Sequence, residues 1–120
     1  MNLDKYTFTF GFGFLKELNK QHTMASNGLT MRLGLENTLP NLINNDAETL
    51  VEVLKLANRT ETPRASEKDL IELVESTEDI EVLFTEVLGA LKESNFTGMK
   101  TRKFLETVEK NSEKYITTLF

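Results

Sequence analysis

Few residues in this chain could carry chemistry, and none stands in a pattern that enzymes use. His22 is the single histidine, it lies in a polar stretch, and cysteine is absent from the whole sequence. Metal binding and general-base catalysis both need positioned partner side chains, which that stretch does not offer. The five serines lack the glycine-flanked setting of a nucleophile elbow. The sequence therefore predicts no catalytic residue, no metal ligand and a protein that is not an enzyme.

Gly11 and Gly13 stand where a phosphate-binding loop would be expected, between an expected strand and an expected helix. Lys16 occupies the position of the third glycine in a dinucleotide fingerprint, and no parallel β-α-β unit follows. The alternative reading is conformational, because glycines permit a tight turn from strand to helix. We therefore expect a turn at this point and no bound cofactor.

Acidic side chains are concentrated between Ser66 and Glu93, where nine carboxylates stand against two lysines. No segment matches the calcium-loop pattern of acidic residues at alternate positions with a glycine. Most of these carboxylates fall opposite an apolar stripe, which indicates a solvated helix face. Residues 1–45 carry a net charge of +1 and residues 46–120 carry −6. Such an acidic chain is repelled by nucleic acid and by anionic membranes, so we expect protein partners.

Length and composition predict one small cytoplasmic domain. The chain has 120 residues, a usual size for one domain, and 39% of them are apolar. No apolar run approaches the roughly 20 residues needed to span a bilayer. Polar residues interrupt the N-terminus, which therefore lacks the apolar core of a secretory signal.

The segment 6–14 places five aromatic residues within nine positions. Tyr6, Phe8 and Phe10 alternate with threonines, which predicts a strand over about residues 5–10 with all three rings on one face. A strand needs a partner, and we leave open whether Met1–Asp4, a hairpin or another subunit supplies it. Helical spacing follows and predicts a helix from about residue 12 to residue 21. Phe12 and Phe14 belong either to the core or to a subunit or partner interface.

The middle of the chain is expected to contain a loop and two helices. Residues 22–28 have loop composition, with a turn at Asn27-Gly28. A weaker helix is expected from residue 29 to about residue 37, and Pro40 disfavours helix at Leu39 and marks a break or kink there. Asp46 is the expected N-cap of a helix over residues 47–58.

The second half is expected to be helical after a polar linker over residues 59–65. Ser66 and Thr77 are the expected N-caps of two successive helices. The most regular apolar stripe lies on the second of these helices and comprises Ile80, Leu83, Phe84, Val87, Leu88 and Leu91. A break over residues 95–98 precedes a last helix over residues 99–118. The apolar terminal residues are either a docked tail or a partner-binding one.

The sequence thus predicts a mainly α fold, α with a short N-terminal β element, as a small single-domain bundle of about five to six helices. Residues 1–58 would form the strand and first helices, 59–65 the linker, and 66–120 an acidic helical part. The two parts form either one domain or two subdomains.

The stretch Tyr-Thr-Phe-Thr-Phe-Gly-Phe-Gly-Phe-Leu-Lys-Glu-Leu-Asn-Lys, residues 6–20, resembles the opening of the tail assembly chaperones of long-tailed phages and prophages of Gram-positive bacteria. Members start with a short strand and a phenylalanine-glycine turn into a helix that ends in leucine-asparagine. The similarity continues more loosely to about residue 95, through Gly28-Leu29, Asn45-Asp46 and the stretch Leu88-Gly-Ala-Leu-Lys-Glu-Ser94.

This resemblance implies a non-enzymatic assembly factor of the host cytoplasm that is absent from the finished particle. It implies binding of the tape-measure protein, which is kept soluble, and help in bringing the major tail protein to it. Many members are made in two lengths by a programmed frameshift. The family has no catalytic residues to carry over.

The partner-contact candidates are apolar residues near the two ends of the chain. They are Phe12, Phe14, Leu18, Tyr115, Ile116, Leu119 and Phe120. Self-association is also open. The alternatives to a chaperone are a structural head-tail connector component and a small helical regulatory or interaction protein.

Overall fold

The computed structural model describes the backbone of residues 1–119 and the side chains of residues 1–111. The described chain is mainly helical with a short N-terminal strand pair, as the sequence predicts, and it contains a second strand pair that the sequence did not predict. The strands are β1 (Asn2–Leu3), β2 (Tyr6–Thr7), β3 (Thr23–Ser26) and β4 (Leu29–Arg32). The helices are α1 (Phe12–Gln21), α2 (Gly34–Ile43), α3 (Ala47–Asn58), α4 (Glu67–Ser76), α5 (Ile80–Glu93) and α6 (Gly98–Leu119).

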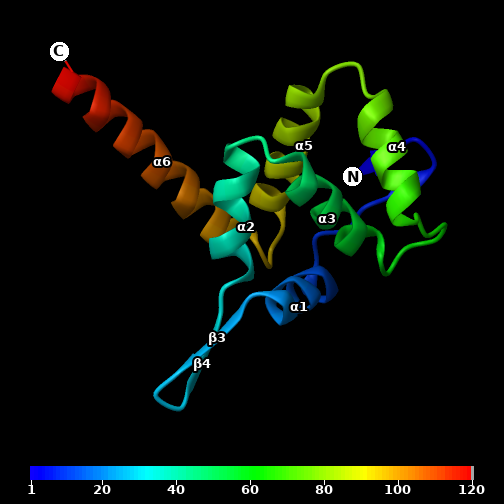
Figure 1. Ribbon diagram of the computed structural model, residues 1–120, viewed down its shortest axis with the longest axis horizontal. Coiled ribbons are helices and arrows are strands. Elements are labelled where there is room, and N and C mark those ends of the chain that lie inside the picture. The colour runs from blue at the N-terminus through cyan, green and yellow to red at the C-terminus, as the bar shows by residue number, and fades with distance from the viewer. Residues whose placement is uncertain (120) are drawn as a thin grey trace.

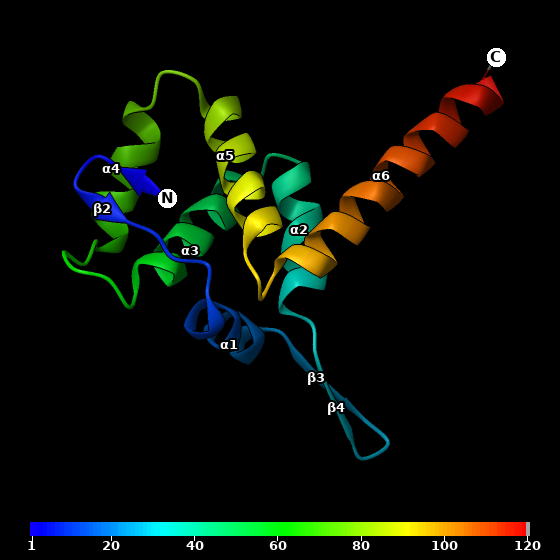
Figure 2. The same ribbon diagram turned by 180° about the vertical axis from the view of Figure 1, so that it is seen from behind.

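Helices α1 to α5 pack around one core, from which two elements project (Figure 1). The projecting elements are the β3–β4 hairpin and the far part of α6, and the view from behind shows the same arrangement (Figure 2). The radius of gyration is 15.5 Å, whereas a compact chain of this length is expected to have about 14 Å. No helix in the described part of the chain is long and apolar enough to cross a membrane.

The N-terminal segment buries its aromatic face, as its alternation predicts. Tyr6, Phe8 and Phe10 are all at least 93% buried, because their exposed fractions are 7%, 1% and 6%. The strand partner lies in the same chain, since β1 pairs antiparallel with β2. Beyond the short β2, the Thr9 amide donates to the Ala57 carbonyl at 2.8 Å and so ties the segment to α3. Only Tyr6–Thr7 of the expected strand is regular, and after Phe8, which still bonds to Met1, the Thr9 amide bonds to α3 instead.

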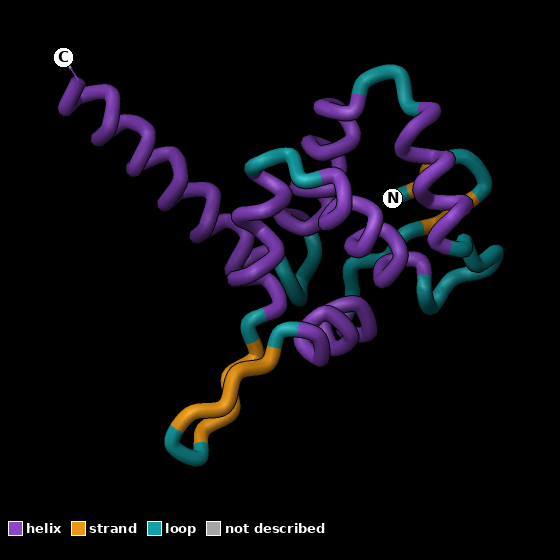
Figure 3. The backbone as a smooth tube through the Cα atoms, in the orientation of Figure 1, coloured by secondary structure: helices purple, strands orange, loops and turns teal. Residues whose placement is uncertain are grey.

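The prediction for residues 22–37 is wrong in its secondary structure. The expected loop and the start of the expected helix form instead the antiparallel β3–β4 hairpin, with Met24 opposite Met31 (Figure 3). The predicted turn at Asn27-Gly28 is present, but it joins two strands. Both residues have positive φ, 52° and 78°, which is the conformation that tight hairpin turns need. The apolar residues of β3 and β4 were too few for the alternation to be recognised.

Helix α2 begins later than expected and continues through Pro40, so helix does not break at Leu39, and the kink that was the alternative stays a prediction. A proline inside a helix loses one backbone hydrogen bond and is normally unfavourable. Here Leu35, Leu39 and Leu42 lie on one face of α2 and are each at most 2% exposed. The burial of these leucines offsets the cost of the proline.

The helix caps agree with the sequence in two of three cases. The Asp46 carboxylate accepts from the Glu48 amide at 3.1 Å and caps α3. Ser66 and Asp69 form a reciprocal capping box at the start of α4, and hydrogen bonds from Ser66 lower the pKa of Asp69. Thr77 is not an N-cap, because it is the C-cap residue of α4. Asp79 caps α5 instead, where its carboxylate accepts from the amides of the first turn.

Asn58 fastens the polar linker to the rest of the fold. It is 1% exposed, and its amide nitrogen donates to the carbonyls of Thr7 at 3.0 Å and Pro63 at 3.2 Å. Its amide oxygen accepts from the Ala65 N–H at 2.7 Å. One side chain therefore joins α3, the N-terminal segment and the linker. The division of the chain at residues 59–65 stays a prediction.

Four of the six residues in the predicted apolar stripe of α5 are buried, namely Leu83, Phe84, Val87 and Leu91. Ile80 at its start is 38% exposed, and Leu88 is only partly buried. Helix α6 matches the expected last helix, and its start is held by buried threonines. The Thr97 hydroxyl donates to the Leu91 carbonyl at 2.6 Å, and the Thr101 hydroxyl donates to the Thr97 carbonyl at 2.7 Å.

Position 34 must be glycine, because the start of α2 lies so close to α1 that there is no room for a side chain. A Cβ at this position would lie 2.6 Å from Asn19 Oδ1, 3.0 Å from Leu18 Cγ and 3.1 Å from the Asn19 backbone nitrogen. Gly34→Ala must push the helices apart, so we expect a loss of about 1–3 kcal/mol in the free energy of unfolding. Gly89→Ala is the control, since a Cβ there meets nothing within 4 Å. In a helix interior that change is expected to stabilise by about 0.5–1 kcal/mol. Chemical denaturation measures both, and equal effects would contradict the prediction.

Candidate functional site

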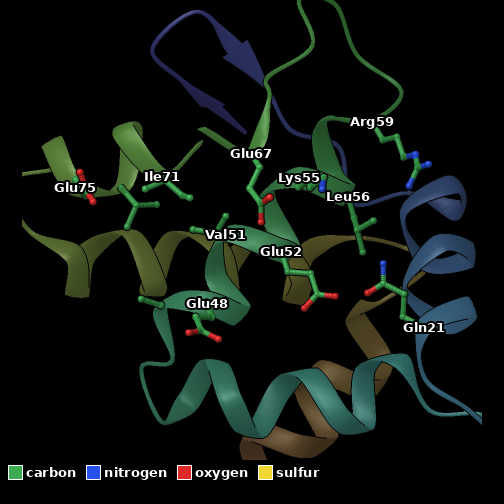
Figure 4. Close-up of a pocket in the computed structure, with 12 residues that line it drawn as sticks. Gln21, Glu48, Val51, Glu52, Lys55, Leu56, Arg59, Glu67, Ile71 and Glu75 are labelled. Atoms are coloured by element: carbon green, nitrogen blue, oxygen red, sulfur yellow. The ribbon is translucent and has the colours of Figure 1, made fainter. Parts of the chain in front are cut away.

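One hollow of the described surface lies between α3 and α4, and we call it the α3–α4 groove. Its volume is about 690 Å³. Figure 4 shows side chains from α3 and α4 around it, with Gln21 at the end of α1 closing one side. The lining residues are Gln21, Ala47, Glu48, Val51, Glu52, Lys55, Leu56, Arg59, Glu67, Ile71, Val74 and Glu75.

The floor of the α3–α4 groove is apolar. Val51 and Leu56 come from α3, and Ile71 and Val74 come from α4. Leu56 and Val74 are buried, whereas Ile71 is 41% exposed and so offers its side chain to anything that enters the groove. A branched aliphatic residue this exposed in the lining of a hollow can still gain free energy from burial.

The rim of the groove is mostly acidic. Glu48 and Glu52 follow each other by one turn of α3, and Glu67 and Glu75 lie one turn before and after Ile71 on α4. Lys55 and Arg59 are the cations of the lining, and Arg59 is engaged by Glu17 at 3.5 Å. Four carboxylates against two cations give the groove a negative rim around an apolar floor.

A second surface combines aromatic and basic side chains of α1, the end of β4 and the turn between α5 and α6, and we call it the Phe12 surface. Phe12 is 61% exposed and Phe96 is 54% exposed, and their ring centroids lie 5.8 Å apart in an edge-to-face arrangement. Lys16, Lys20 and Arg32 line a hollow beside Phe12 with a volume of about 420 Å³. This surface has the opposite charge to the groove.

The sequence-predicted contact residues fall into three groups. Phe12 is exposed, as a contact residue must be. Phe14 and Leu18 are 2% and 1% exposed, so within this chain they form core and offer no surface. Tyr115, Ile116, Leu119 and Phe120 lie outside the residues whose side chains the structure describes. The role of all seven residues in partner binding stays a prediction.

Sequence reasoning missed the α3–α4 groove and also missed Phe96. The acidic residues of α4 were interpreted as a solvated face. The available signal was the row Glu67, Ile71, Glu75, in which an apolar residue interrupts acidic ones at helical spacing. The sequence alone could not show that α3 places a second set of acidic and apolar residues beside this row of α4.

The described residues contain no group of three metal-ligating side chains that could hold an ion. Each buried side-chain nitrogen or oxygen in the described part has a hydrogen-bond partner.

A family model described as "Phage tail assembly chaperone protein, TAC" matches residues 1–106. The chain belongs to this family. The match includes all of the α3–α4 groove and the Phe12 surface, so both belong to the part that the chaperone shares with its family. No curated protein and no solved structure gives a significant match to the chaperone. The family assignment agrees with the resemblance carried by residues 6–20.

Proposed function

We propose that this chaperone binds the tape-measure protein of a long-tailed phage in the host cytoplasm and keeps it soluble until the tail tube forms. We also propose that it helps to bring the major tail protein to that complex, and that it acts without catalysis. The family assignment supports an assembly role. The α3–α4 groove is the observation that supports binding of an apolar client.

The shape of the groove suits a helical client. Helix-in-groove recognition places the apolar face of an amphipathic helix on an apolar floor, with anchor residues one turn apart. Ile71, Val51 and the edge of Leu56 offer such a floor between two helices. A long helical client exposes apolar stripes before assembly, and covering them reduces its aggregation.

The charge of the groove selects among helices. Glu48, Glu52, Glu67 and Glu75 favour a client stripe that is flanked by lysine or arginine, since opposite charges at the rim speed association and suppress wrong partners. The negative charge of the chain, −5 in total, also keeps the complex dispersed. The Phe12 surface is left free for the major tail protein, which would meet aromatic and basic side chains there.

Ile71→Glu is the variant that tests the groove. We expect about tenfold weaker binding of the tape-measure protein or more, because an unpaired carboxylate would be buried against the apolar floor. Co-expression followed by co-purification reports solubility of the client, and calorimetric titration with client fragments reports affinity.

Val82→Glu is the matched control for this experiment. Val82 is 50% exposed, and it lies on α5 outside the groove. The Val82→Glu substitution introduces the same charge as Ile71→Glu and should leave client binding unchanged. Equal binding by both variants would reject the groove as the client site, whereas no association of the unaltered chain with the client would reject the proposed function itself.

Mass spectrometry of purified particles separates the chaperone from a structural head-tail connector component. A chaperone is absent from finished particles, so we expect no peptides of this chain. Its presence at a fixed number of copies per particle would favour the structural role.

A further inference from the structure

The Phe12 surface presents two aromatic rings from elements that are far apart in the sequence. Phe12 begins α1, and Phe96 belongs to the turn between α5 and α6, which lies beside α1 in both views (Figures 1 and 2). Both rings are more than half exposed, although they contact each other edge-to-face. Aromatic side chains are enriched at protein interfaces. The pair therefore marks a surface that suits a protein partner.

The turn that carries Phe96 is held in place by contacts with the rest of the fold. The Ser94 hydroxyl donates to the Phe10 carbonyl, and the Phe96 amide donates to the Ser94 hydroxyl at 3.3 Å. Thr97 is buried, and its hydroxyl donates to the Leu91 carbonyl at 2.6 Å. The turn thus keeps Thr97 inside the molecule and Phe96 outside. A ring that is fixed in this way loses little conformational freedom when a partner binds, which favours affinity.

The hollow beside Phe12 follows one face of α1 to the base of the hairpin. Its lining residues recur at helical spacing, and they are Phe12, Leu15, Lys16, Asn19, Lys20, Thr23 and Arg32. Arg32 joins this face because the strand register places it directly opposite Thr23, and opposite residues share a face of a hairpin. An aromatic ring therefore stands at one end of the hollow, and three basic side chains follow toward the other end.

The basic character of this region is local. Residues 12–34 contain three lysines or arginines and one glutamate, which gives a net charge of +2 in a chain whose total is −5. The glutamate, Glu17, pairs with Lys20 at 3.3 Å. No ion pair of the described residues involves Lys16 or Arg32. These two cations are therefore able to pair with carboxylates of a partner.

We propose that the Phe12 surface binds an acidic segment of its protein partner, with an apolar anchor against Phe12 and carboxylates at Lys16, Lys20 and Arg32. This inference rests on the proposed binding of the major tail protein at this surface, and it adds the chemistry of the bound segment. Lys16 lies about 6 Å along α1 from Phe12, and Lys20 about 12 Å. Carboxylates about two and four residues from the anchor of an extended segment reach these distances.

Single-stranded nucleic acid is the other ligand that basic and aromatic side chains recognise. The total charge of −5 and the acidic rim of the α3–α4 groove repel a long polyanion. Three cations in one hollow also make few phosphate contacts, and phosphate contacts dominate the affinity for nucleic acid. A short acidic peptide needs only the local cations and an apolar anchor, so the observations favour the peptide.

A fluorescent nine-residue peptide tests the recognition without the major tail protein. The probe has phenylalanine at its centre and glutamates two and four positions away on each side, so it suits either chain direction. One matched peptide has lysines in place of the glutamates, and another has serine in place of the phenylalanine. By fluorescence polarisation, we expect the full-length chain to bind the glutamate peptide about tenfold more tightly than the lysine peptide, and about fivefold more tightly than the serine peptide. An oligothymidine of equal length should bind more weakly than the glutamate peptide.

Variants of the full-length chain assign the binding to the Phe12 surface. Lys16→Glu with Arg32→Glu should weaken binding of the glutamate peptide about tenfold or more and strengthen binding of the lysine peptide, with the largest effect at low salt. Phe96→Ser should weaken the glutamate peptide about threefold at every salt concentration, because it removes apolar area and no charge. Arg64→Glu with Lys68→Glu is the matched control. It makes the same change of charge at exposed positions outside the hollow, and it should bind like the unaltered chain.

Three results would overturn the proposal: equal binding of the glutamate and lysine peptides, tighter binding of the oligothymidine, or equal losses in the charge-reversed variant and its control. Co-purification with the major tail protein separates this proposal from the proposed function. If the charge-reversed variant binds that protein as well as the unaltered chain does, the acidic segment is wrong and the assembly role stands. If the chain selects the glutamate peptide but does not bind the major tail protein, the role is wrong and the site stands. Circular dichroism melting confirms that every variant is folded.

Discussion

Replacing Phe14 by alanine is expected to lower the free energy of unfolding by about 3–5 kcal/mol, the usual cost of removing a buried phenylalanine ring. The ring is 2% exposed, and it packs edge-to-face on Phe10 with centroids 5.1 Å apart. Its loss leaves a cavity where α1 meets the N-terminal segment. At roughly 4 °C per kcal/mol for a chain of this size, the melting temperature should fall by about 12–20 °C.

Phe12→Ala is the matched control, because it makes the same substitution two residues earlier in the same helix. Phe12 is 61% exposed and contacts the equally accessible Phe96 ring. Only the aromatic pair is lost, so we expect about 1 kcal/mol or less. Thermal and denaturant unfolding of both variants gives the comparison. Similar losses for the two would show that Phe12 is buried in solution, against the arrangement described above.

Replacing Asn58 by alanine is expected to cost about 3 kcal/mol or more, although the residue is small and polar. The amide group serves three backbone groups, the carbonyls of Thr7 and Pro63 and the N–H of Ala65. A buried group that loses its partner carries about 1–3 kcal/mol of desolvation cost. The change should also loosen the linker over residues 59–65, which hydrogen exchange at the Ala65 amide would report.

Asn44→Ala is the control for Asn58. Asn44 is exposed at the end of α2, and its replacement should change stability by less than about 0.5 kcal/mol. Asn58→Asp is a second variant, since it keeps an acceptor for Ala65 but removes both donors. We expect it to be at least as harmful as Asn58→Ala. A mild effect of both Asn58 variants would mean that water replaces the amide, and the linker would then be held by other contacts.

The elements with strong local signals could be predicted from sequence. Helix α3 has an N-cap at Asp46 and a continuous apolar face, and both are local. The rings of Tyr6, Phe8 and Phe10 alternate without interruption, so their common buried face follows from strand geometry. Membership of the family was indicated by the same aromatic stretch.

The missed elements depend on contacts between distant residues. Pro40 remains helical because the leucines of α2 are buried where α2 packs against α1, α3, α5 and α6, which no local pattern shows. The hairpin has only three large apolar residues, so its pairing is fixed by the turn at Asn27-Gly28 and by its base at Asn19. The α3–α4 groove exists only where two separate helices meet. Its acidic rows looked like ordinary solvent-facing positions when each helix was taken alone.

The anchoring of α6 has a mechanical consequence. Twenty-two residues give this helix a length of about 33 Å, and only its first turns lie against the body (Figures 1 and 2). The described contacts there include the buried Thr101, the Lys100–Glu36 ion pair at 2.6 Å, the bond from Arg102 to the Lys92 carbonyl at 2.9 Å and Phe104, which packs against the core. A rotation of about 10° at this base sweeps the far end through about 6 Å. A small tilt at the contacts around Glu36 and Lys92 would therefore move the far part of α6 by several times the shift at its base.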